Sequence, residues 1–63
     1  MPFKIKEARK EKGFTQGELA KRAHVSRATI IGLENGSITV TTTETLTKIA
    51  GALNKKVSDI FLA

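Results

Sequence analysis

The fold of this chain is decided by residues 13–36, which read GFTQGELAKRAHVSRATIIGLENG. Apolar residues recur along this stretch every three or four positions, as they do along one face of a helix. Gly13 and Gly36 stand where helices are expected to end, because glycine readily takes the left-handed conformation that closes them. The stretch therefore predicts two short helices between these glycines.

Two hydroxyl residues mark where these helices begin. Thr15 and Glu18 have the spacing of a capping box, in which each side chain satisfies a free backbone N–H group of the other residue. Ser26 is a favoured N-cap residue and begins the second helix, which runs to Asn35. The first helix is expected to end near Ala23, so that only a very short connection joins the pair.

So short a connection forces the two helices to cross steeply. Close approach at the crossing needs a small side chain, which Ala20 provides, while Ile30 and Leu33 pack beneath the first helix. The other face of the second helix is then free, and its residues are Arg27, Ala28, Ile31 and Gly32. Because this face has a short side-chain profile, the helix backbone can sit deep in the major groove of DNA.

Segments on both sides of this stretch complete a predicted all-α bundle. One helix is expected over about residues 3–12, a fourth begins at Thr41 or Thr42, and a short fifth covers about 56–62. Three aromatic residues are assigned to the core: Phe3, Phe14 and Phe61. None of these helices is long enough to be stable alone in water, so we expect residues 1–63 to pack as one domain.

Net charge separates the two halves of the chain. Lys and Arg number 11 against 6 Asp and Glu, which gives a net charge of +5. Residues 1–31 hold eight basic and three acidic residues, so the whole excess lies there. A positive field of this kind suits a surface that meets a polyanion such as nucleic acid. A solvated helix face rich in lysine carries the same charge, so charge alone leaves both interpretations open.

Several classes of protein are disfavoured by what the sequence lacks. Without cysteine there is no disulfide, thiol nucleophile or cysteine-based zinc site. With one histidine and no acid pair at catalytic or metal-binding spacing, we expect no enzyme, no metal and no cofactor. No small-molecule effector is evident, no apolar run is long enough to span a membrane, and no signal peptide is found. We therefore expect a cytoplasmic protein without a membrane partner.

Between Arg9 and Gly36 the chain resembles the helix-turn-helix of the phage repressor and Cro family, also called the xenobiotic-response-element family. The family's pattern is approximately R-x-x-x-G-[LF]-[ST]-Q-x-x-L-A, then V-S, then I-x-x-[LW]-E-N-G, and this chain matches nearly all of it. Residues 46–53 and 57–61 are similar to the family's fourth and fifth helices. The resemblance implies a compact five-helix, lambda-repressor-like DNA-binding domain with its helix-turn-helix at about residues 15–35.

The resemblance also implies which residues contact DNA. Gln16, at the start of its helix, is expected to bond a backbone phosphate with help from the helix dipole. Ser26 is expected to cap the next helix and to contact phosphate. Arg27 and Ala28 hold positions that usually face bases, where arginine can grip a guanine edge and alanine can meet a thymine methyl. The loop after Gly36 is expected to contact the next phosphates through Ser37, Thr39 and Thr41.

Three positions depart from the family's pattern. His24 replaces the usual glycine of the turn, and we interpret it as a turn residue rather than a ligand. Gly32 stands where members often place a long polar base-reader, so one contact is lost. Ile31 stands where a small polar residue is common; it either meets thymine methyls or is simply an exposed apolar residue.

Two further expectations concern contacts within and between chains. Arg9 and Glu34 match positions that commonly form a partly buried ion pair in the family. The pairing also has a physical basis, since the helix dipole disfavours an anion in a last turn unless a cation faces it. Four apolar residues crowd the last short helix and are expected to make a two-fold dimer contact: Val57, Ile60, Phe61 and Leu62.

The function that follows is sequence-specific binding of double-stranded DNA by a helix-turn-helix transcriptional regulator. We expect a repressor that acts as a homodimer on two half-sites about one helical turn apart. The alternative is a protein-interaction module of the same fold, either antitoxin-like or a bridging factor. Salt dependence separates the two, because binding through several phosphates weakens steeply as salt rises.

Overall fold

Side-chain hydroxyls cap three of the five helices in the computed structural model, which describes residues 3–61. Thr15 accepts a hydrogen bond from the backbone N–H of Glu18 and begins α2 (Gln16–Ala23), and Ser26 does the same for α3 (Arg27–Asn35). Thr42 caps α4 (Thr43–Ala52). The other helices are α1 (Ile5–Glu11) and α5 (Val57–Ile60). The expected all-α fold with five helices is confirmed.

Four residues in the left-handed backbone conformation lie just after the ends of α1, α2, α3 and α4. Gly13 has a φ of 73° after α1 and Gly36 has a φ of 86° after α3, as expected from glycine at both positions. His24 closes α2 with a φ of 57°, so histidine does adopt the conformation for which the family uses glycine. Asn54 ends the turn after α4 in the same conformation, with a φ of 56°.

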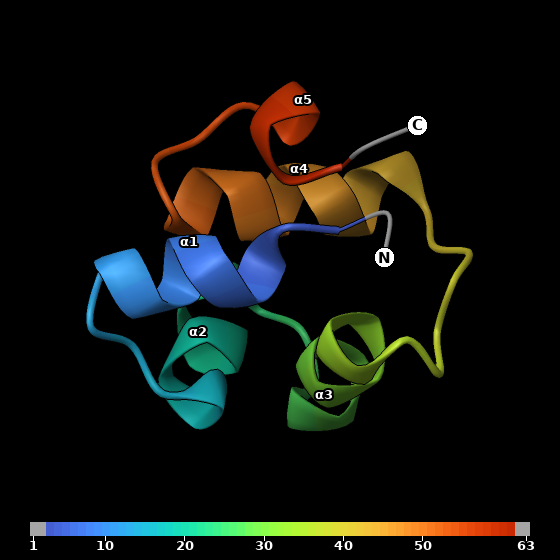
Figure 1. Ribbon diagram of the computed structural model, residues 1–63, viewed down its shortest axis with the longest axis horizontal. Coiled ribbons are helices and arrows are strands. Elements are labelled where there is room, and N and C mark those ends of the chain that lie inside the picture. Colours follow the sequence, from blue (N-terminus) through green and yellow to red (C-terminus); the bar gives the residue numbers. More distant parts are fainter. Residues whose placement is uncertain (1–2, 62–63) are drawn as a thin grey trace.

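One apolar core joins all five helices. In the view of Figure 1, α2 and α3 lie below α1 and α4 and α5 lie above it, while α2 packs directly against both α3 and α4. Seven large side chains are fully buried in the core: Ile5, Leu19, Ile30, Leu33, Ile49, Leu53 and Ile60. An antiparallel bridge between Phe3 and Phe61 ties the two ends of the described chain together, with the ring centroids 5.4 Å apart.

Some local expectations were wrong. The capping box at α2 is only half formed, because the Glu18 carboxylate accepts from Arg22 at 2.9 Å instead of turning back to Thr15. Phe61 remains 36% exposed, so it is not a core residue in the sense that Phe3 is. Phe14 is half-buried, with the Arg22 guanidinium 4.4 Å above the centre of its ring.

None of the helices found in residues 3–61 combines the length and the apolar character needed to cross a membrane.

Candidate nucleic-acid interface

The turn between α2 and α3 sets the orientation of the two helices. His24, Val25 and Ser26 form the whole connection, and the Val25 N–H donates to the Ala20 carbonyl at 3.0 Å. Ala20 is 4% exposed, while Ile30 is completely buried beneath α2. The small residue therefore lies in the buried contact, as the short connection between the helices predicts.

The outer face of α3 is exposed at three of the four expected positions. Arg27, Ala28 and Ile31 are all exposed, so their side chains are available to a partner. Gly32 is the exception, because it is buried under Ile38 from the loop that follows α3. A Cβ at position 32 would collide with the Ile38 side chain.

The placement of Gly32 corrects the expectation that it lies on the free face. The Ile38 N–H donates to the Gly32 carbonyl at 3.0 Å, so the loop folds back directly onto α3. Glycine at this position is explained by the close approach of the loop. Helical periodicity cannot reveal such a contact, because Ile38 lies outside any helix.

The loop after α3 presents hydroxyl groups next to this face. Ser37 and Thr39 are exposed and Thr41 is half-buried. The Ser37 N–H donates to the Asn35 side chain at 2.8 Å, which holds the first turn of the loop. All three residues therefore lie in one short segment that continues from the C-terminal end of α3.

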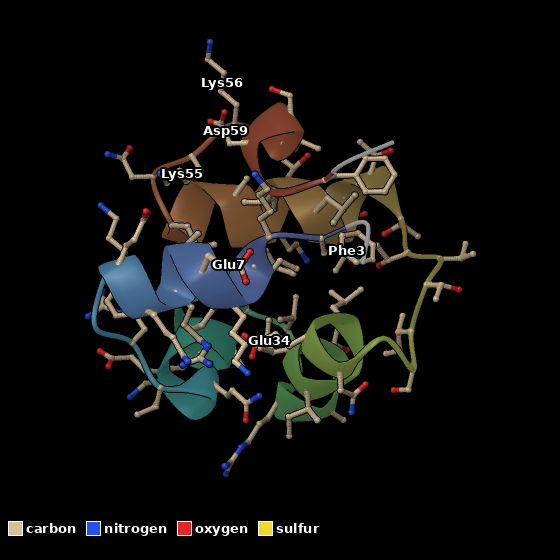
Figure 2. The ribbon with its side chains drawn as sticks, in the orientation of Figure 1. Phe3, Glu7, Glu34, Lys55, Lys56 and Asp59 are labelled. Atoms are coloured by element: carbon tan, nitrogen blue, oxygen red, sulfur yellow. The ribbon has the colours of Figure 1, made fainter. Side chains whose placement is uncertain are left out.

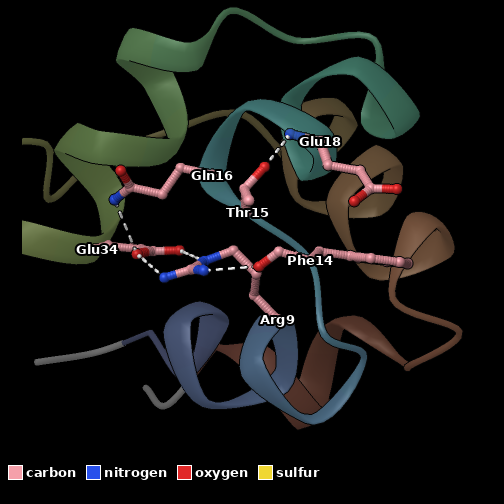
Figure 3. Close-up of polar contacts among 6 residues, drawn as sticks. All are labelled: Arg9, Phe14, Thr15, Gln16, Glu18 and Glu34. Atoms are coloured by element: carbon pink, nitrogen blue, oxygen red, sulfur yellow. Dashed lines mark hydrogen bonds and ion pairs between the residues drawn. The ribbon is translucent and has the colours of Figure 1, made fainter.

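A network of four residues ties Gln16 to the interior (Figure 3). Arg9 Nε donates to Glu34 Oε2 at 2.7 Å, and Arg9 Nη2 donates to Glu34 Oε1 at 3.1 Å. Arg9 Nη1 also donates to the Phe14 carbonyl at 2.7 Å, so the guanidinium links α1 to the segment before α2. Gln16 Nε2 donates to Glu34 Oε1 at 3.1 Å. The side chains of Arg9 and Glu34 are only 11% and 4% exposed, so the expected ion pair is present and largely buried.

The charges around α2 and α3 leave a positive surface. Both carboxylates of these helices are matched by arginine, Glu34 by Arg9 and Glu18 by Arg22 at 2.9 Å. Arg27 forms no ion pair with any residue in the described part of the chain. Neutralised carboxylates beside a free guanidinium favour the approach of an anion. Within residues 3–61, no three potential ligand side chains gather as a metal ion would require.

The expected dimer contact is only partly available. Ile60 is completely buried in the core, which contradicts its assignment to a contact between chains. Val57 is half-buried against the core, Phe61 is 36% exposed, and Leu62 lies outside the described residues. The reason is geometric, since a helix as short as α5 turns Ile60 inward and leaves little apolar surface outside.

A more exposed apolar residue was missed by the sequence reasoning. Val40, in the loop between α3 and α4, is 86% exposed. It lines a groove with a volume of ≈ 340 Å³. The groove is lined by Phe3, Thr39, Val40, Thr41, Thr43, Leu46 and Phe61. A valine among threonines was the available signal, but in a loop there is no periodicity to show its direction.

Comparisons with known proteins agree with this geometry. A family model described as helix-turn-helix matches residues 5–60. The chain is 44% identical over 62 residues to an uncharacterised HTH-type transcriptional regulator of Archaeoglobus fulgidus, and the match covers 98% of this chain and 86% of that protein.

Two solved structures are also similar to this chain. The master regulator for biofilm formation SinR in complex with DNA superimposes with a TM-score of 0.82 at 34% identity, covering 84% of both chains. A chain of the SinR–SinI protein complex superimposes with a TM-score of 0.84 at 33% identity. That match covers 87% of this chain and 53% of the other, so this chain spans about half of its length.

Proposed function

The chain belongs to the helix-turn-helix family of DNA-binding transcriptional regulators, and on that premise we propose that it is a cytoplasmic repressor that binds its operator as a homodimer. The observation that carries the proposal is the outer face of α3. This face exposes Arg27, which forms no ion pair within residues 3–61, beside the short side chain of Ala28 and the apolar Ile31. A helix with this profile can approach base edges closely in the major groove.

Base contacts are assigned to α3. Arg27 donates two hydrogen bonds to the O6 and N7 atoms of a guanine, and Ala28 offers its methyl group to a thymine. We assign Ile31, one turn further along α3, to a second thymine methyl, because its side chain is exposed and apolar. Gly32 is left out of the contacts, since it is buried under Ile38.

Phosphate contacts are assigned to the ends of the helices and to the loop. Gln16 and Ser26 stand at the N-termini of α2 and α3, where backbone N–H groups and the helix dipole attract an anion. The loop adds its hydroxyl groups at Ser37, Thr39 and Thr41. Such contacts position the protein on the duplex, whereas the α3 side chains select the sequence.

Homodimer formation is proposed because one domain of this size reads only a few base pairs. Two copies on half-sites about 34 Å apart, one helical turn, double the sequence that is read. The exposed apolar side chains beside the groove, Val40 and Phe61, support a contact between copies on this side of the domain. We assign Val57 to the edge of this proposed contact, because its side chain is only half-buried.

Selection of bound fragments from a random duplex pool tests the proposed function. We expect a palindromic consensus with half-sites one turn apart, and binding that weakens steeply with salt. The matched control pair is Arg27→Gln and Lys56→Gln, each of which removes one positive charge. Lys56 is the N-cap residue of α5, and its side chain lies on the side of the molecule away from α3 (Figure 2). Equal losses for the two variants, or a pool without enrichment, would contradict the proposal.

The alternative function is a protein-interaction module. It is favoured by one observation, the similarity to a chain of the SinR–SinI protein complex. The positive surface of α2 and α3 would then accept an acidic protein instead of DNA. Binding that requires the protein partner, and that shows no salt-dependent affinity for any duplex, would favour this alternative.

A further inference from the structure

The Gln16 amide makes a contact that a phosphate anchor does not by itself require. Its Nε2 atom donates to Glu34 Oε1 at 3.1 Å, across the gap between α2 and α3. A carboxylate accepts hydrogen bonds only, so the amide must turn its nitrogen and not its oxygen toward Glu34. The primary amide has a second N–H bond, which has no acceptor within residues 3–61, and Gln16 is only half-buried, so this bond is available to another partner.

Glu34 is itself held rigidly. Its side chain is 4% exposed and receives two hydrogen bonds from Arg9, which is fixed in turn by the Phe14 carbonyl. A bidentate arginine–carboxylate pair has a fixed plane and little freedom to rotate. The Glu34 Oε1 atom therefore provides a rigid acceptor for Gln16.

The same pairing removes an electrostatic obstacle. A bare carboxylate next to a phosphate contact would repel the phosphate, but Arg9 cancels the charge of Glu34 at a distance of 2.7 Å. Glu34 can then orient Gln16 without opposing the anion that Gln16 binds. A flexible glutamine loses side-chain entropy when it binds, and this loss is smaller if the protein already holds the side chain.

From these contacts we infer that Glu34 is a positioning residue for DNA binding, which holds the Gln16 amide so that its second N–H bond faces the phosphate. The inference rests on the proposed function and assigns a second role to the Arg9–Glu34 pair. Arg9 acts one step further back, because it fixes and neutralises Glu34. The interior of the domain is thereby connected to its DNA-binding surface through a chain of hydrogen bonds.

A double-mutant cycle in DNA affinity tests the inference, with wild type, Gln16→Ala, Glu34→Gln and the double variant. Gln16→Ala is expected to weaken binding roughly tenfold, the loss of one hydrogen bond to a charged group. Glu34→Gln is expected to weaken binding roughly fivefold in the wild-type background and less than about twofold in the Gln16→Ala background. Circular dichroism at low temperature verifies that each variant is folded. Glu18→Gln is the matched control, because its exposed carboxylate bonds only Arg22, and we expect a change within about twofold.

Two further measurements guard against a Glu34 variant that fails to fold. Gln16→Asn keeps the amide and the Arg9–Glu34 pair but is one methylene too short, so it is expected to lose nearly as much affinity as Gln16→Ala. In the free protein, one Gln16 side-chain N–H resonance is expected to show slowed hydrogen exchange. Glu34→Gln should reduce this protection, because Arg9 and Gln16 then compete for the one remaining acceptor oxygen. A purely structural role for Glu34 predicts the same loss of affinity in both backgrounds, and that result overturns the inference alone. A wild-type protein that binds no duplex overturns the proposed function, and the inference falls with it.

Discussion

Two regions of this domain, the α2–α3 surface and the groove beside Phe61, are organised by different kinds of interaction. The α2–α3 side is organised by buried charge, since Glu34 receives three hydrogen bonds, two from Arg9 and one from Gln16. The groove beside Phe61, whose lining includes Thr39 and Thr41 of the loop after α3, has no comparable polar network among residues 3–61, and its exposed residues include the apolar Val40. Directional hydrogen bonds thus fix the α2–α3 side, where recognition needs a defined geometry. Exposed apolar surface remains beside the groove.

The difference teaches how so small a chain can bind DNA with a rigid surface. A chain of 63 residues has few core side chains, and a core alone rarely supplies more than roughly 3–5 kcal/mol at this size. Hydrogen bonds to a buried carboxylate add direction where apolar packing cannot. The contact between two copies that we propose on the apolar side needs less precision, because it can adjust to the spacing of the half-sites.

The largest effect is expected from breaking the buried network. Arg9→Ala or Glu34→Ala should lower the free energy of unfolding by about 3 kcal/mol, because either change leaves the other charge buried without its partner. The double variant should cost less than the sum of the two, since no unpaired charge then remains. Urea unfolding of the four proteins measures this. Single losses below about 0.5 kcal/mol that simply add would mean that the pair behaves as a surface pair.

A second prediction concerns Gly32, where Ile38 of the loop after α3 packs against the helix. Helix propensity alone predicts that Gly32→Ala stabilises the protein by about 1 kcal/mol. We expect the opposite sign, a loss of about 1–3 kcal/mol, because the new Cβ would collide with Ile38. Thermal unfolding gives the sign directly. Combining Gly32→Ala with Ile38→Ala should recover part of the loss, and a stabilised single variant would show that the loop moves aside freely.

A third prediction concerns Arg27 on the exposed face of α3. Arg27→Ala should weaken operator binding by roughly 1–3 kcal/mol and relax the preference at one base pair, while the fold is unaffected because the side chain is exposed. Titration of a set of single-base operator variants measures both quantities. An unchanged preference with a salt slope lower by about one would reassign Arg27 to a phosphate.

Local signals in the sequence account for most of the fold and for part of the site. Thr15 and Ser26 cap helices, Gly13 and Gly36 close them, and each acts through its nearest neighbours in the chain. The Arg9–Glu34 pair joins residues 25 positions apart, and it was predictable because the family's pattern names both positions.

What the sequence could not show depends on contacts between segments that are distant or irregular. Gly32 was assigned to the free face because helical periodicity places it there, but a loop residue covers it. Ile60 was assigned to a dimer contact because apolar residues crowd the last helix, but its side chain is completely buried in the core. The bond from Gln16 to Glu34 was not predicted either, since it depends on the distance between α2 and α3.

The smallest effect on stability is expected on the apolar side, from Val40→Asp. Val40 is 86% exposed, so the free energy of unfolding should change by less than about 0.5 kcal/mol. Its effect should appear in assembly, because a carboxylate at the rim of the groove would be buried without a partner between two copies. A stable interface takes roughly 800 Å² from each partner, about a fifth of the 3924 Å² surface of this chain. We therefore expect the contact to be weak in free solution and to form on DNA with two half-sites.

Sedimentation with and without such DNA tests this expectation for wild type and for Val40→Asp, with Thr47→Asp as a control that adds the same charge outside the groove lining. Wild type and the control should place two copies on one duplex cooperatively, whereas Val40→Asp should fill the half-sites independently. Cooperativity is compared relative to binding at a single half-site, because a carboxylate between Thr39 and Thr41 also weakens that binding through repulsion of the phosphates. Cooperativity that survives the Val40 change would move the contact to another surface. Only one copy on every duplex, even at high micromolar protein, would rule out the homodimer and leave the DNA-binding side of the comparison intact.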